Sequence, residues 1–170
     1  MTQLLLVGGG VATGLLLLLS AFFSSSETAI FSVPPDWGEQ KGAEGDSRGH
    51  TLDELQDDSH RLLVTLLVGN NVVNVAISSI ITVLVVQNLP PGPAVVATTG
   101  ITSALVLVFG EIVPKSYGLG NAEEWSLTVA PVVVLVETLL SPVISVFDWV
   151  TSGINERISG EHDIERPYLE

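Results

Sequence analysis

Three clusters of polar residues interrupt or end apolar stretches that are long enough to cross a bilayer. A polar group in hydrocarbon is costly unless it is paired, so such residues indicate a functional site. Their hydroxyl, amide, carboxylate and backbone oxygens are hard ligands, which suit Mg²⁺, Ca²⁺ or Na⁺ and argue against Zn²⁺ or copper. The clusters are Phe23–Ala29, Gly69–Asn74 and Gly110–Lys115.

The second cluster has helical spacing. Asn70, Asn74 and Ser78 lie at i, i+4 and i+8, which places them on one stripe of a helix. Asn71 lies about 100° further round and can face another helix. Such amides can simply hold membrane helices together. Three asparagines within five residues, matched by serines and a glutamate on other stretches, favour a binding site instead.

The third cluster contains a glutamate beside a helix-breaking proline. Pro114 cannot donate a backbone hydrogen bond to the carbonyl of Gly110, four residues earlier, so that oxygen can act as a ligand. Glu111 would then be the single anionic ligand of a cation. The alternative is a carboxylate at the membrane edge, hydrated or paired with Lys115. One carboxylate only partly neutralises a divalent ion, so we expect binding weak enough for release.

The first cluster contributes fewer groups than its serine count suggests. Ser24, Ser25 and Ser26 point about 100° apart, so one or two of them can face a common site. Ser24 continues a polar stripe that includes Ser20 and Thr28. Glu27 has three open roles, because it can cap the helix, pair with a basic residue or bind a second ion.

Composition excludes several classes of protein. Charged residues make up 15% of the 170 residues, against about 25% in soluble domains, and none lies between Arg61 and Glu111. The formal net charge of −13 excludes a nucleic-acid partner, which would need a basic face. Cysteine is absent, and the apolar stretches contain no histidine that could activate a nucleophile. We therefore expect a membrane protein that is not an enzyme.

The apolar pattern predicts an all-α membrane protein with spans at about 3–33, 62–88 and 94–118. A fourth apolar stretch contains Pro131, Glu137 and Pro142, and it can either cross the membrane or lie along its surface. Three spans place all six basic residues on one side, which the positive-inside rule makes the cytoplasm. We therefore expect an amphipathic juxtamembrane helix at about 125–150, an outer N-terminus and a cytoplasmic C-terminus in the cell membrane.

The first loop, 34–60, is expected to be cytoplasmic and partly helical. Thr51-Leu52-Asp53-Glu54 has the pattern of a capping box. The pattern predicts a short helix that starts there and runs through about Arg61.

Together the three clusters resemble the signature motifs of the transmembrane domain of the CorC/CNNM (cyclin M) magnesium transporters. The resemblance covers nearly the whole chain, and it departs at Ser25, where the family often has glycine or alanine. It implies a homodimer whose protomers each have three transmembrane helices, short cytoplasmic helices and a juxtamembrane helix. It also implies export of a largely dehydrated Mg²⁺, coupled to Na⁺ entry by alternating access.

The resemblance also implies a ligand set and a domain plan. The expected Mg²⁺ ligands are Ser24, Asn70, Asn74, the Gly110 carbonyl and Glu111. Their neighbours, or ligands of a sodium or second-ion site, would be Ser25, Asn71, Ser78 and Glu27. Residues 1–150 would form the transport domain. Residues 151–170 would lead to a CBS module, the part through which full members bind ATP.

Three kinds of partner are expected besides the transported ions. They are a second copy of the chain, membrane lipids and, through the CBS module alone, ATP. Two alternatives to transport stay open at this point. One is a magnesium-sensing membrane anchor or scaffold that moves nothing, and the other is a cation channel.

Overall fold

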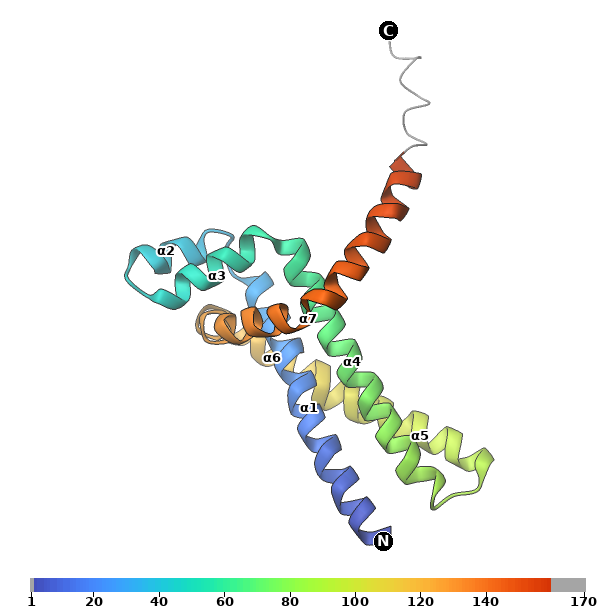
Figure 1. Ribbon diagram of the computed structural model, residues 1–170. Coiled ribbons are helices and arrows are strands. Elements are labelled where there is room, and N and C mark those ends of the chain that lie inside the picture. Colours follow the sequence, from blue (N-terminus) through green and yellow to red (C-terminus); the bar gives the residue numbers. More distant parts are fainter. Residues whose placement is uncertain (1, 160–170) are drawn as a thin grey trace.

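The computed structural model describes residues 2–159, and the side chains of residues 3–147. Within these residues the chain is all helical, as the sequence predicted (Figure 1). The elements are α1 (Thr2–Ser32), α2 (Trp37–Ala43), α3 (Ser47–Asp57), α4 (Ser59–Val86), α5 (Pro91–Leu105), the π-helix η1 (Val106–Ile112), α6 (Val113–Gly120) and α7 (Ala122–Ser159).

Four segments are long and apolar enough to cross a membrane. They are Gln3–Ser32, Ser59–Val86, Pro91–Gly120 and Ala122–Phe147. The first three match the predicted spans to within a few residues, and the third is built from α5, η1 and α6 in succession. The chain is therefore a multi-pass membrane protein. The fourth segment meets the same criterion of length and apolarity, although the sequence favoured three crossings.

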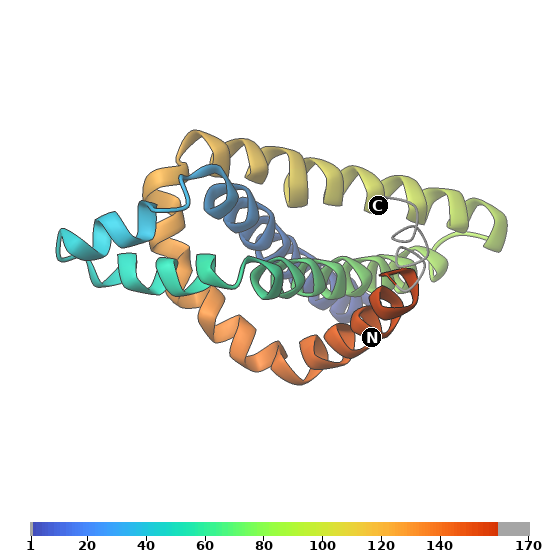
Figure 2. The same ribbon diagram turned by 90° about the horizontal axis from the view of Figure 1, so that it is seen from above.

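The membrane helices pack around α1. It runs antiparallel to α4, and the chain turns back at Gln87–Pro90 into α5 (Figure 1). Seen from above, α1 lies between α4 and α6 (Figure 2). Glycines allow these close approaches: a Cβ atom added to Gly69 would lie 2.6 Å from the ring of Phe23, and one added to Gly118 would lie 2.4 Å from the carbonyl oxygen of Ser25.

The first half of α7 has a different direction from the other long helices. It runs across α1 and α4 rather than alongside them, and its later part turns away from the bundle (Figure 1). Two prolines, Pro131 and Pro142, lie inside this helix, where each removes a backbone hydrogen bond. The carboxylate of Glu137 accepts a hydrogen bond from Arg61 at the start of α4, so an acidic group in an apolar stretch has an ion-pair partner.

The predicted start of the loop helix is wrong. α3 begins at Ser47, and its N-cap is Asp46, whose carboxylate accepts from the backbone N–H of Arg48 at 2.9 Å. Thr51 therefore lies inside α3, because the earlier aspartate caps the helix first. The helix also ends before Arg61: the backbone breaks at Asp58, which caps the next helix, α4.

Arg48 also sets the charge state of this cap. The guanidinium of Arg48 hydrogen-bonds the Asp46 carboxylate at 2.7 Å and, together with its backbone N–H, lowers the pKa of that carboxyl from 3.8. Because the pKa of the Asp46 carboxyl is lower in the folded state, the contribution of this cap to the free energy of unfolding is complete above pH about 4. It is lost as the pH falls through the lower folded-state value.

Close packing of α6 against α1 gives a first prediction. Gly118→Ala should lower the thermal unfolding midpoint of the detergent-solubilised protein, because the new methyl group meets the backbone of Ser25. We expect a cost of about 1–3 kcal/mol. Gly100→Ala is the control, since an added Cβ there has no atom within 4 Å. An unchanged midpoint in Gly118→Ala, measured by tryptophan fluorescence, would contradict this packing.

Candidate cation site

Ser20 of α1 lies at the point where three helices meet. Its side chain is fully buried, and its Oγ lies 2.9 Å from the Oδ1 atoms of both Asn70 and Asn74 on α4. A hydroxyl carries one proton, so it can donate to only one of these amide oxygens at a time. Three oxygens therefore meet around a single proton. A cation in their midst would satisfy all three.

The third helix reaches the same point through Gly110. A Cβ atom added to Gly110 would lie 2.7 Å from Ser20 Oγ, so the backbone of η1 passes directly beside this hydroxyl. Gly110 lies in the π-helix η1, where the N–H of Val113 bonds the carbonyl of Val108, five residues earlier. Pro114 follows and supplies no N–H to the Gly110 carbonyl. Single π-helical turns are frequent at functional sites.

Ser24 lies one turn from Ser20 on the same face of α1. Its side chain is fully buried, and its hydroxyl has no hydrogen-bond partner. Its backbone carbonyl accepts from Thr28, so the hydroxyl oxygen is the group left over. Buried hydroxyls without partners are rare because they lose their hydrogen bonds to water. Ser24 therefore has a free oxygen of the kind that a cation site needs.

Glu111 follows Gly110 and is half-buried. Within residues 3–147 the structure gives its carboxylate no ion pair, because Lys115 pairs with Glu27 at 3.2 Å instead. The alternative in which Lys115 neutralises Glu111 is therefore not the arrangement seen. Of the three roles open for Glu27, pairing with a basic residue is the one that the structure shows.

The other candidates are used differently or lie further away. Asn71 is exposed and donates to the Leu67 carbonyl of its own helix at 2.9 Å, so it does not join Asn70 and Asn74. Ser25 is engaged in packing, since it donates to the Phe22 carbonyl and accepts from the indole N–H of Trp125 at 3.1 Å. Ser78 is half-buried one turn beyond Asn74.

The sequence did not identify Ser20 as the residue at which the three helices meet. The residue was recognised only as a member of a polar stripe, because its own neighbours in the sequence, Leu19 and Ala21, carry no signal. The clue was the four-residue spacing between Ser20 and Ser24. Spacing alone could not show that α4 would face Ser20 with both asparagines.

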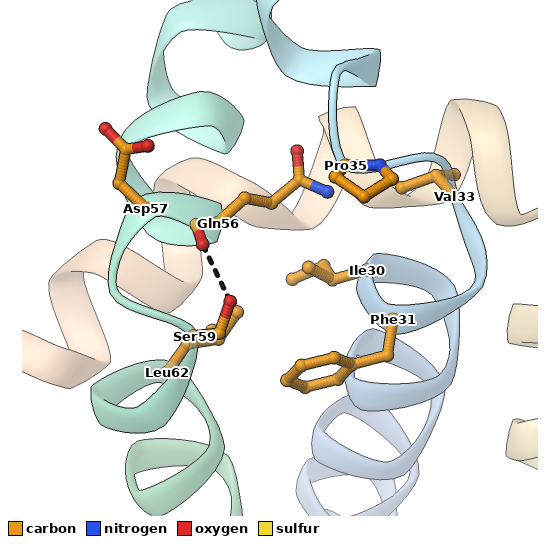
Figure 3. Close-up of a pocket in the computed structure, with 8 residues that line it drawn as sticks. All are labelled: Ile30, Phe31, Val33, Pro35, Gln56, Asp57, Ser59 and Leu62. Atoms are coloured by element: carbon orange, nitrogen blue, oxygen red, sulfur yellow. Dashed lines mark hydrogen bonds between the residues drawn. The ribbon is translucent and has the colours of Figure 1, made fainter.

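The cluster consists of the fully buried Ser20 and the half-buried Asn70 and Asn74. An open pocket of about 260 Å³ lies elsewhere, between the end of α1 and the junction of α3 and α4 (Figure 3). There the Ser59 hydroxyl donates to the Gln56 carbonyl at 2.7 Å. None of the predicted site residues lines that pocket. Among the described side chains, no three His, Cys, Asp or Glu residues cluster in a way that could hold a metal ion.

Fold and site together define a multi-pass membrane domain in which side-chain oxygens of two helices meet beside a third helix. The chain belongs to the cyclin M family: residues 11–170 match the family described as the Cyclin M transmembrane N-terminal domain. It is 33% identical over 160 residues to a chloroplastic DUF21 domain-containing protein of Arabidopsis thaliana. It is 26% identical over 145 residues to the UPF0053 inner membrane protein YfjD of Escherichia coli.

The matches cover most of this chain and a smaller part of each relative. They include 94% of the chain and 24% of the Arabidopsis protein, and 85% of the chain and 34% of the Escherichia coli protein. A UPF0053 protein of Haemophilus influenzae, 26% identical, is similarly covered over 36% of its length. The chain therefore spans about a quarter to a third of these relatives.

Removing the Ser20 hydroxyl gives a second prediction. Ser20→Ala should weaken Mg²⁺ binding about tenfold in isothermal titration calorimetry, because one oxygen is lost from the cluster. Ser79→Ala is the matched control, since this exposed hydroxyl donates to the carbonyl of Val75 on its own helix. Equal affinities in the two variants, with both still folded, would remove Ser20 from the site.

Proposed function

We propose that this chain carries Mg²⁺ across the membrane by alternating access and exports it in exchange for Na⁺. The observation that carries the proposal is the convergence of α1, α4 and η1 on Ser20. Side-chain oxygens of α1 and α4 meet there beside the backbone of η1, with no basic residue among them. Relative movement of the helices can therefore both assemble such a site and take it apart.

The ligand set suits a dehydrated magnesium ion. Mg²⁺ demands near-ideal octahedral geometry at 2.0–2.1 Å and gives up water reluctantly, so it needs several closely spaced oxygens. Those we assign are Ser24, Asn70, Asn74, the Gly110 carbonyl and Glu111, with Ser20 at their centre. The missing side chains of Gly69 and Gly110 permit the close helix approach that such a set requires.

The charge of the site supports release as well as binding. Glu111 is the carboxylate nearest to Gly110 in the chain, and Lys115 is already engaged with Glu27. A single negative charge balances half of the charge of Mg²⁺. Sodium entering down its gradient would then drive the ion out, and Ser78 on the same stripe of α4 is a candidate sodium ligand.

The orientation belongs to the same proposal. All six basic residues fall on the cytoplasmic side if α7 lies along the membrane surface. Two features support that placement: the first half of α7 runs across α1 and α4, and Trp125 at its start is hydrogen-bonded to Ser25 near the end of α1 (Figure 1). The N-terminus would be outside and the C-terminus cytoplasmic.

A second copy of the chain is the proposed partner within the membrane. Phe109, Ile112 and Val113 are exposed beside Glu111, and a second protomer or lipid must cover them. If ATP regulates transport, it would do so through a CBS module in a longer protein that contains this transmembrane domain.

Glu111 provides the third prediction. Glu111→Ala should abolish Mg²⁺ flux in proteoliposomes, because the only carboxylate assigned to the site is lost. The protein should still fold, since Glu111 makes no ion pair within residues 3–147. Glu54→Ala, at an exposed position on α3, is the control. Undiminished flux through Glu111→Ala would refute the assignment, and absent flux in the unaltered protein would refute transport itself.

Membrane topology provides the fourth prediction. The natural chain contains no cysteine, so single cysteines report their own side of the membrane. An impermeant maleimide applied to intact cells should label Asn88→Cys and leave Ala43→Cys and Ser152→Cys unlabelled. Labelling of Ser152→Cys together with Asn88→Cys would mean that α7 crosses the membrane as a fourth span.

A further inference from the structure

Threonine hydroxyls in the membrane helices behave in two ways. One group donates to the carbonyl four residues earlier, as Thr residues in helices commonly do. This group consists of Thr28, Thr65, Thr82, Thr99, Thr128 and Thr138. In the other group, Thr13 on α1 and Thr98 and Thr102 on α5 keep their hydroxyl oxygens buried and without a partner.

Burial alone does not explain the difference. Thr65 is fully buried and still donates to the Arg61 carbonyl at 2.8 Å. Thr13 and Thr98 are 8% and 9% exposed, and their hydroxyls make no such bond. Neither hydroxyl donates to the carbonyl four residues earlier in its own helix, so each is buried with its hydrogen-bonding capacity unused.

The three unpaired threonines lie at a similar depth in the membrane. α1 and α4 are antiparallel, and two contacts fix their register: Ser20 meets Asn70 and Asn74, and Gly9 meets Leu84. Thr13 is therefore level with about residue 80 of α4. The short turn at Gln87–Pro90 brings α5 back along α4, so Thr98 and Thr102 lie opposite the segment at about 75–79.

We call Thr13, Thr98 and Thr102 the threonine tier. At a rise of about 1.5 Å per residue, Thr13 lies roughly 10 Å from Ser20 along α1, toward the end of the bundle that carries the Gln87–Pro90 turn. Ser78 continues the Asn70–Asn74 stripe of α4 toward the same end. The tier thus stands between the cation cluster and the membrane surface on the side of that turn.

We propose that the threonine tier is a second cation station, where an ion leaving the Ser20 cluster regains water. The inference rests on the proposed function. Neutral hydroxyls without a carboxylate cannot replace the whole hydration shell of Mg²⁺, which keeps several waters wherever it can. They can hydrogen-bond the water around a hydrated ion. The three oxygens are shielded from water in this conformation, so the tier would meet the hydrated ion in the state of the transport cycle that opens toward the Gln87–Pro90 turn.

Flux measurements on the full chain test this role. The double variant Thr98→Val with Thr102→Val keeps the side-chain shape and removes both unpaired hydroxyls. Its matched control is Thr82→Val with Thr99→Val, which removes two exposed hydroxyls already bonded to their own helices. The tier variant should slow Mg²⁺ flux about tenfold relative to the control and leave Mg²⁺ affinity at the cluster unchanged. Equal flux in the two double variants would overturn the proposal.

A second measurement does not depend on transport. Single cysteines are placed at Thr98, Thr102 and Thr99 in the cysteine-free chain, and a cationic, membrane-impermeant thiosulfonate is added from the side of the turn. Only the thiolate reacts, and it forms only where water reaches. Thr98→Cys and Thr102→Cys should react faster than Thr99→Cys, and equal or slower reaction would overturn the proposal.

The two measurements keep this inference separate from the proposed function. Faster labelling in a protein that carries no flux would support the tier and refute transport. If Thr98→Cys and Thr102→Cys react no faster than Thr99→Cys while flux still requires Glu111, the second cation station is refuted and the proposal of transport is not.

Discussion

The structure depends on oxygens that hydrocarbon cannot satisfy. The fully buried Ser20 hydroxyl meets the half-buried side chains of Asn70 and Asn74 between α1 and α4. Burying such groups is costly, so their positions constrain everything around them. The register of α1 on α4 brings both asparagines to Ser20, and the glycine at position 110 lets the backbone of the π-helix η1 pass beside the same hydroxyl.

Charged groups outside the cluster hold the helices that carry it. Arg61, at the start of the asparagine-bearing helix α4, pairs with Glu137 of α7, and Lys115 ties α6 to Glu27 of α1. Trp125 fixes the start of α7 to Ser25 on the same helix as Ser20. The ion pairs leave Glu111 unpaired among the described residues, so the basic side chains do not compete with a cation for its carboxylate.

Much of this fold follows from the chain itself, because runs of apolar residues define membrane helices almost without regard to their neighbours. The bounds of three of the four long apolar segments were predicted to within a few residues for that reason. The predicted start of α3 was wrong because Asp46, five residues before Thr51, is the residue that caps the helix, and local patterns do not rank two possible caps. The part played by Ser20 depends on which face α4 turns toward α1, which is a property of the packed bundle.

We propose that α1, α4 and η1 together hold a cation at Ser20. Anomalous scattering from crystals of the protein grown with Mn²⁺, which takes the same oxygen ligands as Mg²⁺, tests this directly. We expect one strong peak within coordination distance of the Asn70 and Asn74 amide oxygens and the Gly110 carbonyl. A cluster without a peak at saturating Mn²⁺, or a peak only among the carboxylates outside the membrane, would contradict it.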